Sequence, residues 1–467
     1  MADNARGRGQ SKLTLATVTA SDTIAAIATA HGHGALGVVR ASGPAVQQLL
    51  MALIGIIPAP RQAMYRPIRS AAGETIDAGL ILYFSAPASF TGEDVCEFHT
   101  HGNPLLMQDL LQELCRQGAR PARPGEFSER AFRNGKLDLA QAEAIADLIE
   151  SRSLRAARSA LRTLQGEFSK RIHAIVEALI TSRVAFEGAI DFPDDIPGET
   201  LAAAEFPRVA TNRDQIRALL ASARQGARLH SGATVAIVGA PNVGKSTLLN
   251  RLARADKAIV SAIPGTTRDI IEVDTLICDV PVRLCDTAGL RPTQDPIEQE
   301  GIRRASQAMS GADLILLMTE DPMVQAPAAQ FEALGQAGPS NTQVLIVHNK
   351  IDTLGLPAAR ISTPDAEHVF ISARDGGGVD LLMETLGVLL GIEASEESEF
   401  VARSRHLDAL ELASAELAPL TLALATNAPE LAAEGLRRAA DALHAIIGGG
   451  GSEALLGEIF SRFCIGK

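Results

Sequence analysis

One short segment constrains the fold of this chain more than any other. Residues 239–246 read Gly-Ala-Pro-Asn-Val-Gly-Lys-Ser, which matches the spacing G-x-x-x-x-G-K-[ST]. An apolar run at 235–238 precedes the segment, and a helical pattern begins at Thr247. In such a strand–loop–helix unit, backbone N–H groups surround the phosphates of a nucleotide and face them with the positive end of the helix dipole. The segment therefore predicts a phosphate-binding loop.

The residues around this loop predict the sheet that carries it. Strands that alternate with helices form a doubly wound parallel sheet. Five short apolar runs alternate with helical segments here, at 235–238, 282–284, 314–318, 344–347 and 369–371.

Further segments identify the bound nucleotide as a guanine nucleotide. Asp352, in Asn-Lys-Ile-Asp at 349–352, can accept hydrogen bonds from guanine N1–H and the exocyclic amine, which adenine cannot donate. Asp-Thr-Ala-Gly at 286–289 would sense the γ-phosphate, and Ser-Ala-Arg at 372–374 would close over the base. We predict a Ras-like P-loop GTPase domain at 232–391. Its predicted nucleotide contacts are Asn242, Val243, Gly244, Lys245, Ser246, Thr247, Thr267, Asp286, Thr287, Ala288, Gly289, Asn349, Lys350, Asp352, Ser372, Ala373 and Arg374.

The hydrolytic chemistry depends on a few of these side chains. Lys245 would contact the β- and γ-phosphates, and Mg²⁺ would be held by Ser246 and Thr267. Many small GTPases have a glutamine directly after the Asp-x-x-Gly segment, which orients the attacking water. This chain has Leu290 there, so the water must be positioned from elsewhere. The nearby acids are Glu298 and Glu300, and the alternative that both are ordinary surface acids stays open.

Composition limits the class of protein. Lys and Arg total 43 against 55 Asp and Glu, a net charge of −12, which excludes a generally basic nucleic-acid-binding protein. Five cysteines without a C-x-x-C pair predict a reduced, cytoplasmic chain rather than a disulfide framework. The longest apolar run, 49–60, is too short for a transmembrane helix, so we expect no membrane span.

Segments outside the GTPase domain carry a specific resemblance. They are Phe-Thr-Gly-Glu-Asp-Val at 90–95, Arg-Pro-Gly-Glu-Phe-Ser-Glu-Arg-Ala-Phe at 123–132, Lys-Leu-Asp-Leu-Ala-Gln-Ala-Glu-Ala at 136–144 and Phe-Cys-Ile-Gly-Lys at 463–467. With these segments the chain resembles the MnmE family (also called TrmE) of tRNA-modification GTPases, from about Ser21 to Lys467.

The pattern of apolar runs and helical segments, together with the resemblance, implies a multidomain architecture of α/β and all-α parts. We expect a disordered tail at 1–20 and a tetrahydrofolate-binding-like α/β domain at 21–136, which would also form the dimer contact. Apolar residues at 168, 172, 175 and 179 mark one face of an amphipathic helix. A discontinuous helical domain is expected at 137–231 and 392–467, with the GTPase domain inserted between its halves.

The resemblance also implies a function that spacing alone does not show. A homodimer would work with the flavoprotein MnmG (also called GidA) in a heterotetramer, with FAD only on that partner. Together they would form an aminomethyl or carboxymethylaminomethyl group at C5 of the wobble uridine, position 34, of certain tRNAs. Either 5,10-methylene-tetrahydrofolate or 5-formyl-tetrahydrofolate would supply the one-carbon unit. The implied folate-binding residues are Arg40, Glu97, Lys136 and Lys467.

The family hydrolyses GTP with K⁺, which implies further roles in this chain. The potassium ligands would be Asn242, Ser261, Ile263 and Thr266. The first-switch loop that contacts GTP would be Ser261, Ala262, Ile263, Pro264, Gly265 and Thr266. Glu298 would orient the attacking water, alongside Lys245 at the phosphates. Cys464 would lie near the folate and the target base, either as a nucleophile or as a residue that only lines the site.

Two questions stay open from the sequence. Arginines cluster at 116–136 and 152–162, where they would bind tRNA phosphates or instead pair with acids such as Asp147 and Glu150. A ribosome-assembly GTPase and a signalling GTPase with a docking domain are the alternative functions. Folate binding would separate these from the family, because a docking domain has no reason to bind folate.

Overall fold

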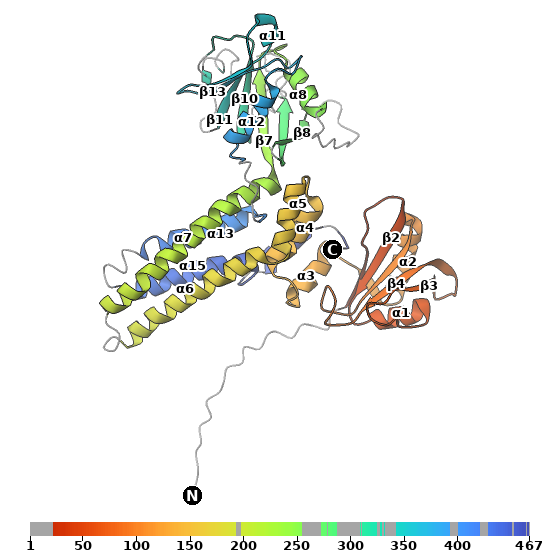
Figure 1. Ribbon diagram of the computed structural model, residues 1–467. Coiled ribbons are helices and arrows are strands. Elements are labelled where there is room, and N and C mark those ends of the chain that lie inside the picture. The colour runs from red at the N-terminus through yellow and green to blue at the C-terminus, as the bar shows by residue number, and fades with distance from the viewer. Residues whose placement is uncertain are drawn as a thin grey trace, which may run out of the picture. The chain divides into compact units, whose positions relative to one another are not determined.

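The computed structural model groups the chain into two compact units (Figure 1). One unit is Met1–Asp138 with Gly451–Lys467, and the other is Leu139–Gly450. The structure describes residues 22–192, 198–254, 272–277, 279–286, 309, 311–324, 327–328, 331, 342–392, 400–420, 428–450, 453–463 and 465–466. The tail expected at 1–20 lies outside these residues. None of the helices in the described part has the length and hydrophobicity to cross a bilayer.

The first unit is built on a six-stranded sheet in the order β3-β4-β5-β2-β1-β6. Helices α1 (Val46–Ile54) and α2 (Pro104–Arg116) pack on one face, where alternate residues of the strands are buried. Short apolar runs at 36–39, 80–84 and 95–98 lie in β2, β4 and β5. The strands are β1 (Thr23–Ile27), β2 (Gly34–Ser42), β3 (Met64–Arg69), β4 (Thr75–Phe84), β5 (Val95–Gly102) and β6 (Ala119–Pro121).

Helices α3 (Glu126–Arg133) and α16 (Glu453–Ser461) meet in this unit, although 320 residues separate Arg133 from Glu453. The rings of Phe132 and Phe460 lie 6.3 Å apart, and Arg133 pairs with Glu453 at 2.6 Å. A Cβ atom on Gly125 would lie 2.5 Å from the Phe460 carbonyl oxygen. The sequence analysis assigns 392–467 to the helical domain, whereas these contacts group α16 with the N-terminal unit.

The helical part of the second unit surrounds one apolar core. Phe168, Ile172, Ile175 and Leu179 are all buried, as their spacing predicts. The core includes residues from both sides of the GTPase insertion. Helix α6 ends at Asp191 and α7 begins at Gly198. The helices are α4 (Leu139–Glu150), α5 (Leu154–Leu164), α6 (Glu167–Asp191), α7 (Gly198–Ser231), α13 (Ser404–Leu417) and α15 (Pro429–Ile447).

The second sheet has seven strands in the order β12-β13-β11-β10-β7-β9-β8. Four of the five runs predicted as strands lie in β7 (Ala233–Gly239), β9 (Val280–Asp286), β10 (Leu314–Thr319) and β11 (Gln343–His348). The fifth, 369–371, overlaps the end of β13 (Glu367–Phe370), and these five strands pair in parallel.

The two strands at the edges of this sheet were not predicted. These are β8 (Glu272–Ile277) and β12 (Ala359–Ser362), and each pairs antiparallel with its neighbour. Strand β12 is short and mostly exposed, so it lacks the apolar signal of a central strand. Helices α8 (Lys245–Arg254) and α12 (Val379–Leu389) supply residues to the core of this domain.

Candidate nucleotide-binding site

The predicted phosphate loop connects β7 to α8, at the carboxyl end of a central strand. Asn242 and Gly244 have φ angles of 65° and 102°, in the left-handed region. A Cβ atom on Gly239 would lie 2.5 Å from the carbonyl oxygen of Met318 in β10, so a larger residue would not fit there. This tight turn brings the backbone N–H groups at the start of α8 toward one point, the arrangement that binds phosphate.

Three polar side chains, those of Lys245, Ser246 and Asp286, lie close together beside the phosphate loop. The ammonium of Lys245 donates to the carbonyl oxygens of Gly239 at 2.8 Å and Ala240 at 3.1 Å. The Ser246 hydroxyl lies 3.4 Å from Asp286 Oδ2, at the end of β9. Burial raises the pKa of Asp286, although Lys245 opposes the shift. Burial likewise lowers the pKa of Lys245, and Asp286 opposes that change.

This arrangement fits a magnesium ion. Asp286 is 2% exposed, and its Oδ1 atom has no hydrogen-bond partner in the described structure. A buried carboxylate oxygen without a partner is costly, and Mg²⁺ or a water bound to it would satisfy that atom. The Ser246 hydroxyl lies beside this carboxylate, as the sequence predicts for a magnesium ligand. When bound, the ion would neutralise charge on the phosphates.

The other end of the site is organised by one asparagine. Asn349 donates from Nδ2 to the Val243 carbonyl oxygen at 2.7 Å, and its Oδ1 accepts from the Ala373 backbone N–H at 2.9 Å. The side chain therefore joins the phosphate loop to the 372–374 segment. Lys350 follows with a φ of 65°, pairs with Glu320 and begins α11 (Ile351–Leu354). Asp352 is exposed on this short helix, where it can reach a base.

Several predicted contacts lie outside the described residues. They are Ser261, Ala262, Ile263, Pro264, Gly265, Thr266, Thr267, Thr287, Ala288, Gly289, Glu298, Cys464 and Lys467, together with Leu290 and Glu300. Their roles stay predictions.

Two of the predicted folate residues are direct partners on the face of the first sheet opposite α1 and α2, where Phe127 of α3 lies 5.8 Å from the Arg40 guanidinium. Arg40 and Glu97 face each other in neighbouring strands and form an ion pair at 2.7 Å. Burial would raise the pKa of Glu97, but Arg40 and His99 outweigh it, so the pKa of this carboxyl is lowered. The Arg40 guanidinium also lies 5.9 Å from the ring centre of Phe90.

The third folate candidate borders the same loop as Phe90. Lys136 is exposed, and its ammonium donates to the Pro87 carbonyl oxygen at 3.0 Å. The three residues thus border one loop of the N-terminal unit. An exposed cation and an ion pair beside an aromatic ring suit a ligand with carboxylates and a flat ring. Sequence reasoning did not assign His99 to this group, although its ring lies 3.1 Å from Glu97.

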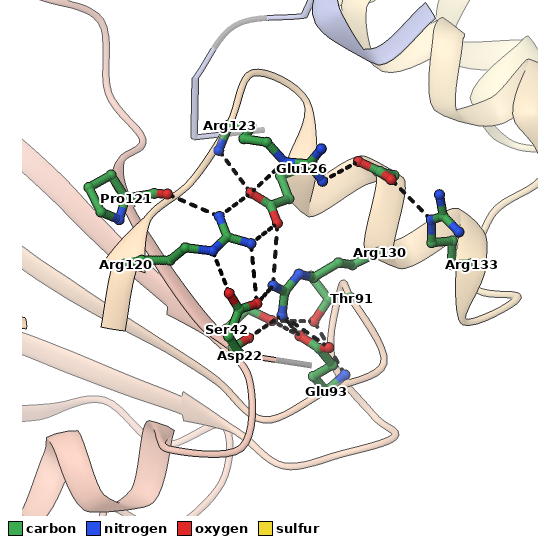
Figure 2. A network of polar contacts seen from close by, with 11 residues as sticks. Asp22, Ser42, Thr91, Glu93, Arg120, Pro121, Arg123, Glu126, Arg130 and Arg133 are labelled. Carbon is green, nitrogen blue, oxygen red and sulfur yellow. Dashed lines mark hydrogen bonds and ion pairs between the residues drawn. The ribbon is translucent and has the colours of Figure 1, made fainter. Parts of the chain in front are cut away.

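Most arginines of the 116–136 cluster are engaged in ion pairs, which favours pairing over tRNA contact there. Figure 2 shows Arg120 and Arg130 between Asp22, Glu93 and Glu126. Burial alone would raise the pKa of Glu126, but Arg120 and the Arg123 backbone N–H lower it to about 2. The remaining ion pairs are Arg116 with Glu113, Arg123 with Glu126 and Glu129, and Arg133 with Glu129 and Glu453.

This network joins the 90–95 segment to the 123–132 segment. Thr91 and Glu93 belong to the 90–95 segment, while Glu126 and Arg130 belong to the 123–132 segment. Ser42 in β2 contacts both Thr91 and Glu93 at 2.7 Å, and Arg130 reaches Glu93 at 3.1 Å. The two segments therefore hold α3 against the sheet. In the other arginine cluster, Arg152 pairs with Asp274 at 2.6 Å, not with the acids expected, and contact of this cluster with tRNA stays a prediction.

Comparison with known proteins decides the family. The chain is 48% identical over 462 residues to the tRNA modification GTPase MnmE of Stutzerimonas stutzeri, which covers 96% of this chain and 100% of that protein. It is 47% identical over 452 residues to the protein of the same name from Coxiella burnetii, with 96% and 99% covered. The chain belongs to the MnmE family. The resemblance stated from the sequence is therefore confirmed.

Two family models match the chain, one before the GTPase domain and one over a range that includes it. The model of the GTP-binding protein TrmE N-terminus matches 23–136, and the MnmE helical domain model matches 139–464. As a member of the MnmE family the chain is a GTP hydrolase that acts in tRNA modification. A solved structure of Era in complex with MgGDPNP and 16S ribosomal RNA is 29% identical, covers 39% of this chain and 66% of that chain, and has a TM-score of 0.27.

Proposed function

We propose that this GTPase is potassium-dependent and, with the flavoprotein MnmG, builds the aminomethyl or carboxymethylaminomethyl group at C5 of the wobble uridine of certain tRNAs. A reduced folate would supply the one-carbon unit, and the chain would act as a homodimer in the cytoplasm. The observation that carries the proposal is the sequence similarity, over nearly the full length of the chain, to proteins named tRNA modification GTPase MnmE. The assembled phosphate loop and the Asn349 bridge support its GTPase part.

Four sets of groups would contribute to the hydrolytic step. Lys245 and the N–H groups of the phosphate loop would bind the phosphates, and Ser246 would hold Mg²⁺. Glu298 would orient the attacking water in place of the glutamine that Leu290 replaces. Potassium, bound at Asn242 and the first-switch loop, would stabilise the negative charge that develops in the transition state.

The N-terminal unit would bind the folate. Arg40 and Lys136 would meet carboxylates of the folate tail, and Glu97 would accept hydrogen bonds from pterin N–H groups. Lys467 would lie nearby, and Cys464 would lie near the target base. The folate would supply a one-carbon unit at the oxidation level of formaldehyde or formate.

The proposal predicts the loss of one class of nucleoside when the gene is deleted. C5-aminomethyl-type uridines should disappear from bulk tRNA and return with the wild-type gene, but not with Glu298→Ala, because water attack on GTP would lack its orienting group. Nucleoside mass spectrometry measures both. Glu300→Ala is the matched control, and it should restore the modification. An unchanged nucleoside profile after deletion would overturn the proposed modification.

A binding experiment tests the folate site separately. The full-length protein should bind 5-formyl-tetrahydrofolate, and Arg40→Met should weaken binding at least about tenfold, as expected for the loss of a charge-assisted hydrogen bond. Arg69→Met is the control, because the exposed Arg69 guanidinium donates to the Gly73 carbonyl oxygen and has no ion pair among the described residues. Equal affinity of the wild type and Arg40→Met, measured by calorimetry, would contradict the assignment.

A further inference from the structure

Arg251 on α8 reaches the loop that would cover the base. Its Nε donates to the Ala373 carbonyl oxygen at 2.7 Å, and its Nη2 donates to the next carbonyl oxygen, that of Arg374. Arg251 is half-buried and lies on the helix that begins with Lys245. One rigid helix thus carries a phosphate-binding residue and a residue that contacts the loop at 372–376, here named the base loop.

The shape of the base loop accommodates this guanidinium. Gly376 has a φ of 94°, and a Cβ atom there would lie 2.7 Å from Arg251 Nη1. The planar guanidinium can donate to two successive carbonyl oxygens at once, a geometry that the single ammonium of lysine does not match. The glycine and the arginine therefore fit each other.

A second bond holds the base loop to the phosphate-loop side of the domain. Asn349 accepts from the Ala373 N–H and donates to the Val243 carbonyl oxygen. Ala373 is thus bound at its N–H by Asn349 and at its carbonyl by Arg251. Hydrogen bonds within the loop, such as Gly376 N–H to the Ser372 carbonyl oxygen at 2.8 Å, shape the turn but do not attach it to the rest of the domain.

We propose that Arg251 is a positioning residue for guanine-nucleotide binding, which holds the base loop against α8 so that residues 372–374 are already in place when the base arrives. The inference rests on the proposed position of the base between Asp352 and the base loop. Without Arg251 the loop must be ordered at the moment of binding, and that ordering weakens affinity. The phosphates and Lys245 are unaffected, so the chemical step keeps its rate once GTP is bound.

The experiment compares Arg251→Met with Arg251→Lys in the full-length protein. Methionine keeps the apolar stem but no donor, while lysine keeps one cationic donor. Release of a fluorescent GDP analogue, followed by stopped flow, should accelerate about tenfold in Arg251→Met and less in Arg251→Lys. An effect of about tenfold is what the loss of hydrogen bonds from a charged group is expected to produce. KM for GTP should rise by the same factor while kcat at saturating GTP stays within twofold of the wild type.

Two further variants separate this inference from the proposed function. Arg360→Met removes an exposed ion pair between Arg360 on β12 and Glu367 on β13, and this variant should release GDP at the wild-type rate. Asp352→Asn should weaken GDP binding and favour xanthosine diphosphate if the base lies where proposed. If Asp352→Asn has this effect while Arg251→Met releases GDP at the wild-type rate, the Arg251 inference fails alone. If Asp352→Asn leaves GDP affinity unchanged, the base site itself is wrong.

Discussion

Replacing Glu143 with alanine is expected to lower the free energy of unfolding by about 3–5 kcal/mol, the cost of breaking a buried ion pair by removing one partner. Glu143 lies on α4 and is 1% exposed. Its carboxylate accepts hydrogen bonds from Arg405 at 2.6 and 2.8 Å and lies 3.0 Å from the ring of His406. Without it, the Arg405 guanidinium loses its only carboxylate partner among the described residues.

Arg405 also connects this carboxylate to a third helix. It donates to the carbonyl oxygens of Ala445 at 3.0 Å and Ile446 at 2.9 Å, in the last turn of α15. Carbonyls in the last turn of a helix lack the usual partner within the helix, so the arginine helps to satisfy them. The Ala445 carbonyl also accepts from the Gly448 N–H, at 3.4 Å. Glu143 thereby orients the side chain that joins α4, α13 and α15, and its loss affects more than one contact.

The same cluster predicts how stability depends on pH. Burial raises the pKa of Glu143, but His406 and Arg405 outweigh it and hold the pKa well below its ordinary value of 4.5. Burial lowers the pKa of His406 below 6.5, and its Nδ1 accepts the Arg403 N–H, which only the neutral ring can do. The unfolded chain therefore binds more protons at both sites, so stability falls as pH drops below about 6.5 and again below about 4.5.

Urea denaturation of the full-length protein, followed by far-UV circular dichroism, measures the free energy of unfolding of the wild type and of Glu143→Ala. Glu434→Ala is the matched control, because Glu434 also has two arginine partners but lies in solvent, where ion pairs contribute little. Its unfolding midpoint should stay near that of the wild type. A Glu143→Ala midpoint as close to the wild type as that of Glu434→Ala would contradict the expected role of the buried cluster.

Replacing Lys245 with alanine is expected to reduce GTP hydrolysis roughly 100- to 1000-fold, as typical for the loss of one group that stabilises transition-state charge. Lys245 is 9% exposed and already held over the phosphate loop by the carbonyl oxygens of Gly239 and Ala240. Its ammonium is therefore pre-positioned where the β- and γ-phosphates would bind. Alanine removes both the charge and this fixed geometry.

Release of phosphate under saturating GTP, Mg²⁺ and K⁺ measures this loss. Lys170→Ala is the control, since Lys170 lies exposed on α6, far along the chain from the phosphate loop. It should hydrolyse GTP at the wild-type rate. Hydrolysis by Lys245→Ala within tenfold of the wild type would show that another cation serves the phosphates.

Features encoded by neighbouring residues were predictable. Five strands of the second sheet follow from apolar runs, because central strands of a parallel sheet are buried on both faces and read as continuous apolar segments. The phosphate loop follows from residues 239–246, since a turn that needs left-handed backbone leaves a local glycine signal. The edge strand β12 escaped because it is mostly exposed and lacks that apolar signal. Strand β8 is largely covered, but Glu272 and Asp274 interrupt its apolar residues, so it does not read as a continuous apolar run.

Features that depend on distant residues were not predictable. Arg251 occupies an ordinary helical position, and only the fold brings it to the base loop. The arginines at 116–136 read as a basic patch, but Arg120 and Arg130 lie among Asp22, Glu93 and Glu126. Helix α16 joins the N-terminal unit because Phe460 fits against Phe132, a contact that no local pattern announces.

The sequence by itself thus determined the nucleotide class, the central strands and the family, because each depends on residue types at short, fixed spacings. The tertiary structure alone decided which charges are neutralised, which helix the C-terminal segment contacts and which side chain holds the base loop. These outcomes depend on residues up to 320 positions apart. An arginine has the same side chain in a surface patch as in a buried ion pair, and only its neighbours in space distinguish the two.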